Sequence, residues 1–98
     1  MKHAGDKALD ELEDLLAELR GEAPLKERKR GVFYLKSSAL LHFHEDAAGL
    51  FADLREGKTW GRHPVNTKTQ QRALVSRVKS ALENAKGAQP RKRRSGPS

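Results

Sequence analysis

Residues 40–55, LLHFHEDAAGLFADLR, decide the fold that we predict for this chain. Apolar and polar side chains alternate on both sides of an acidic break that ends in glycine, residues 45–49. A period of two indicates strands with one buried face, and a turn with an acid first and a glycine last joins antiparallel strands. The stretch therefore predicts a β-hairpin, with one strand over residues 39–44 and the next over residues 50–55.

The register of this hairpin decides which side chains are buried. Pairing Phe43 with Leu50 gathers apolar side chains on one face, namely Phe33, Leu35, Leu41, Phe43, Leu50, Ala52 and Leu54. The other face then carries Tyr34, Lys36, His42, His44, Phe51, Asp53 and Arg55. A slip by one residue would place Asp53 beside Phe43 on the apolar face, so we prefer the first register. A turn over residues 46–49 with a glycine bulge would favour the slipped one.

Short strands are expected on both sides of the hairpin. Residues 32–36, VFYLK, are rich in aromatic and branched side chains and predict a first strand. Residues 59–65, TWGRHPV, predict a short edge strand that Pro64 ends. Residues 24–31, PLKERKRG, are interpreted as a basic connector that precedes the first strand.

Helices are expected before and after these strands. Residues 6–20 carry an apolar stripe at helical spacing, and Asp6 is the predicted cap. A last helix is predicted to begin near Thr67, which has capping-box spacing to Gln70, with Asn66 as the alternative cap. The apolar stripe of this helix consists of Leu74, Val75, Val78, Ala81, Leu82 and Ala85.

The predicted fold is a two-layer α+β domain over residues 6–87. Its order is helix, three- or four-stranded antiparallel meander, helix, with both helices on the apolar face of the sheet. Residues 88–98, AQPRKRRSGPS, have no apolar pattern and predict a disordered basic tail.

The net charge of +7 is unevenly distributed along the chain. Residues 1–23 carry a net charge of −4 and the remainder carries +11. An acidic first helix followed by a basic body indicates contact with a polyanion, and nucleic acid is the partner that we expect. The alternative is that the charge serves solubility alone. The candidate nucleic-acid-binding residues are Lys26, Arg28, Lys29, Arg30, Arg72, Arg77, Lys79, Arg91, Lys92, Arg93 and Arg94.

Binding through these residues is expected to be mostly to the phosphate backbone, with little sequence specificity. No helix-turn-helix, zinc-finger or RNA-recognition motif accompanies the charge. Tyr34, Phe51 and Trp60 would add stacking surfaces if they were exposed, and packing is the alternative role of each. The pattern does not separate DNA from RNA or from an acidic protein partner.

Two histidines form a candidate metal site. His42 and His44 are two residues apart on a strand, so their side chains project to the same side. Neutral imidazoles in this arrangement are metal ligands, with His63, Asp53 or Glu45 as the third ligand. The alternative is a half-exposed polar face on which the histidines are only cross-strand neighbours of Asp53. A metal-binding domain is therefore one alternative function.

A protein-interaction module is the other alternative function. Leu9, Leu12, Leu16 and Leu19 follow the spacing of a short coiled-coil seam, although the helix is too short for a coiled coil of its own. We expect this helix to pack on its own sheet. In the alternative, its seam and acidic sides meet the basic last helix of a second copy, which gives a homodimer.

Other classes of function have little support in the sequence. No apolar run approaches the length of a membrane span, and residues 1–20 lack the apolar segment of a signal peptide. The absence of cysteine excludes disulfides and thiolate metal sites, and a cytoplasmic protein is expected. No serine lies in a glycine-flanked elbow and no glycine-rich phosphate loop occurs, so we expect neither an enzyme nor a cofactor.

Residues 31–55, GVFYLKSSALLHFHEDAAGLFADLR, with Trp60 and the RHPV of residues 62–65, resemble a family of small uncharacterised bacterial proteins. The likeness covers about residues 28–85, and HFHED and GLFAD are its recognisable sequence segments. It implies a domain of unknown function and brings no catalytic residue with it. The order of helix, meander, tryptophan and helix is also similar to MmcQ/YjbR-type domains, which are labelled DNA-binding; that resemblance implies a nucleic-acid partner.

Overall fold

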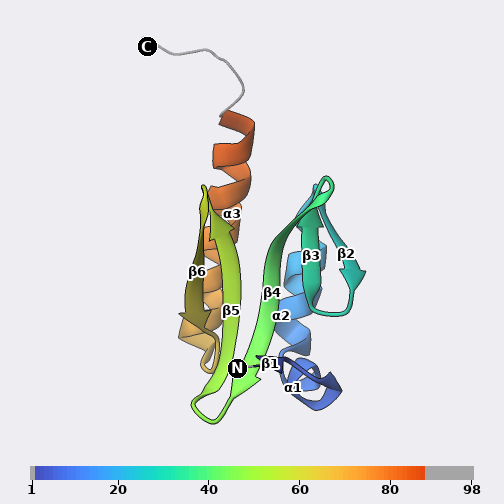
Figure 1. Cartoon of the computed structure of the whole chain (residues 1–98), viewed down its shortest axis with the longest axis vertical. Helices are drawn as coiled ribbons and strands as arrows, with labels where there is room; N and C mark the ends of the chain where they lie inside the picture. Colours follow the sequence, from blue (N-terminus) through green and yellow to red (C-terminus); the bar gives the residue numbers. More distant parts are fainter. Residues whose placement is uncertain (1, 88–98) are drawn as a thin grey trace.

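Most of the strands occupy the middle of the chain, with helices before and after them in the sequence, and one two-residue strand precedes the first helix (Figure 1). The computed structural model describes residues 2–87, with side chains as far as residue 85. In chain order the elements are β1 (Lys2–His3), α1 (Asp6–Glu11), α2 (Glu13–Arg20), β2 (Leu25–Lys29), β3 (Val32–Leu35), β4 (Ser38–Asp46), β5 (Gly49–Glu56), β6 (Thr59–Pro64) and α3 (Lys68–Gly87). The tail predicted over residues 88–98 lies outside the described residues.

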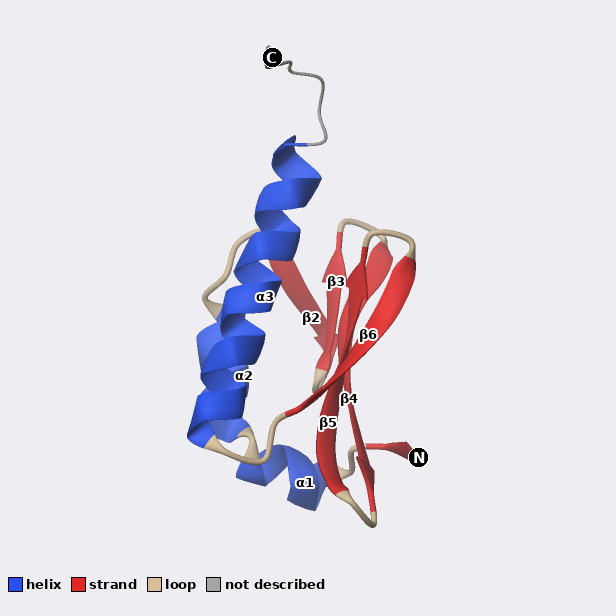
Figure 2. Cartoon of the chain, turned by 90° about the vertical axis from the view of Figure 1, so that its left-hand side faces the viewer, coloured by secondary structure: helices blue, strands red, loops and turns tan. Residues whose placement is uncertain are grey.

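β2 to β6 form an antiparallel meander in which each strand pairs with the next one along the chain. β1 pairs with the part of β4 that lies beyond β3. The helices α2 and α3 lie on one side of this sheet, and no described helix covers its other side (Figure 2). The predicted two-layer α+β fold is thereby confirmed, with five strands in the meander where three or four were predicted. None of the described helices is long and apolar enough to cross a membrane.

The hairpin of β4 and β5 has a register two residues away from the predicted one. Phe43 pairs with Ala52, and Asp46 pairs with Gly49 across a two-residue turn, so the predicted pairing of Phe43 with Leu50 is wrong. A shift of two residues keeps every side chain on its predicted face. The turn over residues 46–49 and the burial pattern therefore agree, because a two-residue connection preserves the alternation on both strands.

Residues 24–31 are not a connector, as the sequence had suggested. Most of them form β2, which pairs with β3 and places Leu25 opposite Leu35 and Glu27 opposite Phe33. Charged side chains are common on edge strands, where one face and one edge remain in water. The composition of β2 therefore conceals a strand that pairing with β3 stabilises.

The first helix is divided in two. The predicted helix over residues 6–20 breaks at Leu12, whose φ of −99° and ψ of 10° are not helical. Asp6 lies in the first turn and Gly5 occupies the cap position, so the predicted cap is wrong. The break leaves the apolar stripe facing the sheet, and its leucines are at most 4% exposed: Leu9, Leu12, Leu15, Leu16 and Leu19.

A bulge in β4 brings an additional leucine into the core. Phe33 pairs with Leu41 and Tyr34 pairs with Ala39, which leaves Leu40 between the two pairs. Because a bulge turns the strand locally, Leu40 and Leu41 are both buried although they are consecutive.

α3 begins at the predicted capping box. The backbone N–H of Gln70 donates to Oγ1 of Thr67 at 3.1 Å, and the N–H of Thr67 donates to Oε1 of Gln70 at 3.2 Å. Asn66 has a different role: its Oδ1 accepts the N–H of Leu50 at 2.8 Å, and its side-chain amide donates to the Leu50 carbonyl at 3.2 Å. The loop that precedes α3 is thereby tied to β5.

Candidate functional site on the open face of the sheet

The side of the sheet that no described helix covers carries a concentration of polar and aromatic side chains. Cross-strand pairing places His42 opposite Asp53, Asp53 opposite Arg62, and His44 between Phe51 on one side and His3 on the other. We define the open face as His3, Tyr34, His42, His44, Phe51, Asp53, Trp60 and Arg62.

Three histidines meet on the open face, and we call them the histidine cluster: His3 on β1, and His42 and His44 on β4. One ring nitrogen from each lies within 4.8 Å of the other two. Nδ1 of His42 and Nε2 of His44 are 2.7 Å apart, which is a hydrogen-bond distance. The rings of His3 and His44 stack with centroids 4.9 Å apart. Pairing of β1 with β4 therefore assembles a polar site from distant parts of the chain.

Asp53 connects the histidine cluster to β6. It is only 8% exposed, and its carboxylate accepts hydrogen bonds from Nε of Arg62 at 2.9 Å and from Nη2 at 3.1 Å. Nε2 of His44 lies 3.1 Å from Oδ2 of Asp53, the oxygen that also accepts from Nη2 of Arg62. Burial alone would raise the pKa of Asp53, but Arg62 and the neighbouring histidines lower it below its ordinary value. The carboxylate is therefore ionised at neutral pH.

The environment of His42 favours its neutral form. Burial lowers the pKa of His42, and the charges that His44 and His3 can carry lower it further, against the opposing effect of Asp53. The ring of Trp60 packs against His42 with centroids 4.8 Å apart. Since a neutral imidazole keeps a lone pair, His42 can accept a proton or bind a metal ion.

One nitrogen of the histidine cluster lacks a partner. Nδ1 of His44 is buried, and no hydrogen bond to it is found among the described residues. An unpaired buried polar atom costs about 1–3 kcal/mol. The histidine cluster therefore contains a buried nitrogen whose hydrogen-bonding capacity is unused among the described residues.

His63, the first of the third ligands suggested by the sequence, is not brought to His42 and His44. It lies opposite Ala52, on the face that the helices cover, because neighbouring residues of β6 point to opposite faces. Nε2 of His63 is 3.3 Å from Oε2 of Glu56. The structure therefore separates it from the histidine cluster by the thickness of the sheet.

His3 is the third histidine beside His42 and His44, and the sequence did not predict it. It belongs to a two-residue strand that has too few residues to show alternation, so only its pairing with β4 places it on the open face. Glu45, another candidate third ligand, instead accepts the backbone N–H of Gly5 at 2.6 Å. That bond helps to hold the end of β1 against β4.

Three of the candidate cations lie together on β2 and are exposed: Lys26, Arg28 and Lys29. Lys26 is opposite Tyr34, and the guanidinium of Arg28 lies over the Tyr34 ring, 5.3 Å from its centroid. The described part of the chain forms no ion pair with any of the three. We call them the β2 cations; they border the open face on the side away from β6.

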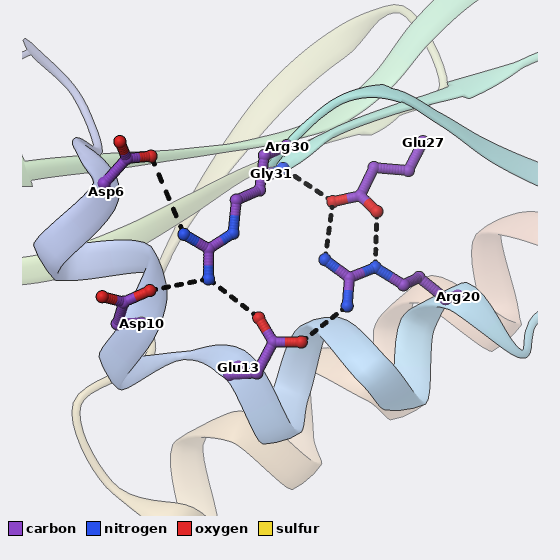
Figure 3. A network of polar contacts seen from close by, with 7 residues as sticks. All are labelled: Asp6, Asp10, Glu13, Arg20, Glu27, Arg30 and Gly31. Carbon is purple, nitrogen blue, oxygen red and sulfur yellow. Dashed lines mark hydrogen bonds and ion pairs between the residues drawn. The ribbon is translucent and has the colours of Figure 1, made fainter.

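Arg30 follows the β2 cations in sequence but points to the helices. Its guanidinium lies 2.9 Å from carboxylate oxygens of both Asp10 and Glu13 (Figure 3). Arg20 of α2 pairs with Glu13 and with Glu27, which extends the network onto β2. The charge of Arg30 is therefore compensated within the chain, and its contacts hold α1 and α2 against the sheet.

The candidate cations of α3 differ in their surroundings. Arg72 is exposed, whereas Arg77 lies 3.4 Å from Glu56 and Lys79 lies 3.7 Å from Glu22. These two distances describe partly exposed, weak ion pairs, and the cations themselves remain accessible. The remaining candidates lie outside the described residues: Arg91, Lys92, Arg93 and Arg94.

The leucine seam of the first helix is not available to a second copy. The seam residues belong to the hydrophobic core of the chain itself: Leu9, Leu12, Leu16 and Leu19. The acidic sides of the same helices pair with cations of the same chain, as in the contacts of Arg20 and Arg30. The homodimer proposed through this helix therefore gains no support from the structure.

No protein-family model, no curated protein and no solved structure matches this sequence. The resemblances drawn from the HFHED and GLFAD segments therefore stay predictions, and the function has to be inferred from the geometry of the chain.

Proposed function

We propose that this chain binds single-stranded nucleic acid along the open face and the β2 cations, chiefly through phosphates and with little sequence specificity. The observation that carries the proposal is the position of Lys26, Arg28 and Lys29. They are exposed, have no acidic partner in the described chain, and lie beside the open face and its aromatic rings.

The acids of α1 and α2 and the β2 cations lie toward opposite faces of the sheet. Acids of α1 and α2 pair with cations on the helix side of the sheet, as Asp10 and Glu13 do with Arg30. The β2 cations and Arg62 remain toward the open face, where the buried acid Asp53 is already paired with Arg62. A polyanion that approaches this side meets positive charge, which favours association at low ionic strength.

Two aromatic rings can contribute to such a surface. Trp60 is 46% exposed, an unusual exposure for the largest apolar side chain, and Tyr34 is half-buried beneath Arg28. Bases of a single strand stack on aromatic rings that an open sheet presents, whereas the bases of a duplex are already stacked. This chemistry favours a single strand over a duplex and is tolerant of base identity.

Anisotropy of a labelled oligonucleotide of about 16 nucleotides tests the proposal, with DNA and RNA versions at two salt concentrations. Replacing all three β2 cations by glutamine should weaken binding and reduce the slope of log K against log salt by about 2, since each phosphate contact on a single strand contributes about 0.7. The matched control changes the same number of charges on α3: Arg72→Gln, Arg77→Gln and Lys79→Gln.

The control variant should retain most of the affinity for the oligonucleotide and most of the slope of log K against log salt. Equal losses in the two triple variants would show attraction by net charge alone and would contradict a site on the open face. Deletion of residues 88–98 measures the contribution of the basic tail separately.

Trp60 is the only tryptophan of the chain, so its fluorescence reports on the open face directly. Stacking of a base should quench it, and Trp60→Ala should weaken binding by about 1–3 kcal/mol. Binding that leaves both the fluorescence and the Trp60→Ala affinity unchanged would exclude the open face as the site of contact.

A further inference from the structure

We propose that His3, His42 and His44 form a binding site for a divalent transition-metal ion, with Zn²⁺ as the reference ion. Asp53 would act behind the site by orienting His44. These histidines lie on the open face but are distinct from the β2 cations, so different variants test metal binding and nucleic-acid binding.

The first observation is the convergence of the ligands. Each of the three histidines offers a ring nitrogen within 4.8 Å of the other two. Nitrogen ligands of one tetrahedral zinc ion, at about 2.0–2.1 Å from the metal, are about 3.3 Å from one another. Small side-chain movements that shorten these distances by about 1.5 Å therefore suffice to bring the three imidazoles onto one ion. The strands that carry them are already held together by pairing.

The second observation concerns the protons of His44. Its Nε2 lies 2.7 Å from Nδ1 of His42 and 3.1 Å from Oδ2 of Asp53, so both neighbours can accept a proton from it. We infer from these contacts that Nε2 carries the proton of the neutral ring. The lone pair is then on Nδ1, the buried nitrogen that has no partner among the described residues.

A metal ion on Nδ1 of His44 would leave the contact with Asp53 intact. Metal-bound histidines usually donate their other ring N–H to a carboxylate, which fixes the tautomer and makes the ligand more basic. Asp53 is suited to this role because Arg62 holds its carboxylate from the other side with two hydrogen bonds, at 2.9 and 3.1 Å. The orienting group of a metal ligand is thereby held rigidly on β5.

The third observation is the type of ligand present. Imidazole binds zinc, copper, nickel and iron, whereas magnesium and calcium prefer sites built from oxygen. Three imidazoles without thiolate leave a position for water or an external ligand in a tetrahedral site.

Calorimetric titration of chelator-treated, tag-free full-length protein with ZnCl₂ tests the site. We expect one equivalent to bind, and we expect His3→Ala to lower the association constant at least tenfold. His3 is exposed and near the chain end, so this variant should fold even if His42→Ala or His44→Ala does not. His63→Ala is the matched control, because it removes the same ring from the opposite face and should change binding less than twofold.

Nitrogen-15 spectra of the histidine rings distinguish the proposed ligation from adventitious binding. Addition of Zn²⁺ should shift Nδ1 of His44 strongly while Nε2 keeps its proton, and Asp53→Asn should weaken binding about 10–100-fold. Binding that is absent, that is unaffected by His3→Ala, or that is lost equally in His63→Ala would overturn the proposal. The variant lacking the β2 cations should bind Zn²⁺ normally, which separates this test from that of nucleic-acid binding.

Discussion

Glu27 shows how one side chain can connect the two layers of the fold. It lies on an exposed edge strand, yet its side chain is only 15% exposed because it points to the helices. Its carboxylate accepts hydrogen bonds from Arg20 and from the backbone N–H of Gly31, the latter at 2.8 Å. Burial alone would raise the pKa of Glu27, but these hydrogen bonds outweigh it and lower the pKa. The ionised form is therefore the stabilising one.

We expect Glu27→Gln to reduce the free energy of unfolding at neutral pH by about 1–3 kcal/mol, because it weakens hydrogen bonds to a charged group. The folded-state pKa of Glu27 lies below its ordinary value of 4.5, so the stabilisation is complete above that pH and is lost as the pH falls through the lowered pKa. Urea unfolding at neutral pH and at about pH 3 measures the difference, which should shrink in acid.

The control for Glu27 is Glu18→Gln, which makes the same charge change at an exposed position of α2. It should alter stability by less than about 0.5 kcal/mol at either pH. A loss in Glu27→Gln that is as large in acid as at neutral pH would mean that packing of the side chain, and not its charge, is responsible.

The four histidines differ in how far their positions follow from the local sequence. The two-residue spacing of His42 and His44 predicts that they share a side, and their contact confirms it. The same spacing rule says nothing of His3 or His63, because the position of each depends on which strand lies beside which. Local alternation establishes a face, and pairing between strands establishes the neighbours on it.

At the scale of elements, the turn between β4 and β5 depends on Gly49. Its φ of 128° is disfavoured for residues with a side chain, and an added Cβ would lie 2.6 Å from Oδ1 of Asn66. Asn66 is the residue that ties the start of β5 to the loop before α3. Gly49 thus permits both the turn and the close approach of that loop.

Gly49→Ala should therefore destabilise the chain by about 1–3 kcal/mol, through backbone strain and displacement of Asn66. Gly57→Ala is the comparison, because Gly57 also has a positive φ, 69°, but has no atom within 4 Å of an added Cβ. Its φ lies in the left-handed region that other residues can enter at a cost of about 1 kcal/mol. Urea midpoints of the two variants test the order, and an equal or larger loss in Gly57→Ala would contradict the role of Asn66.

β2 is the element that sequence patterns conceal. Its only buried apolar residue is Leu25, and its neighbours are charged, so its composition is that of a loop. What makes it a strand is the ladder that it forms with β3 across the turn at Gly31, whose φ is 80°. An edge strand gains its stability from pairing with its neighbour, and the hydrophobicity of the local sequence does not predict that pairing.

At the scale of the whole molecule, one hydrophobic core joins the helix layer to the sheet. It contains leucines of α1 and α2, the inward residues of the meander and the apolar stripe of α3. Leu16 of α2 is fully buried in it, whereas Leu35 of β3 is packed at its margin and half-buried. Substitution of either leucine by alanine removes the same atoms, in one case from the centre of the core and in the other from its margin.

We expect Leu16→Ala to cost about 2–5 kcal/mol and Leu35→Ala clearly less, because the loss grows with the cavity that the substitution leaves. For a small domain with a stability of about 5–15 kcal/mol, the first change removes a large share of the total. Thermal unfolding followed by circular dichroism measures both. Similar losses in the two variants would indicate that the core does not extend through α2 as the structure describes.

Much of the architecture follows from local patterns in the chain. The hairpin of residues 40–55, the faces of its strands and the capping box of α3 all follow from alternation, turn residues and capping spacing, because these act over a few residues. The division of the first helix at Leu12, the strand β2 and the exact partner of Phe43 required the tertiary structure. Each of these depends on how segments distant in sequence pack and pair.

The open face shows the same division. The sequence places His42, His44 and Asp53 on a polar side of two strands. Only the packed molecule leaves that side without a covering helix among the described residues, adds His3 from β1 and places His63 on the opposite face. The physical reason is the distance along the chain over which each effect acts. Side-chain alternation is set by neighbouring residues, whereas a site assembled from β1, β4 and β5 forms only when strands distant in sequence pair.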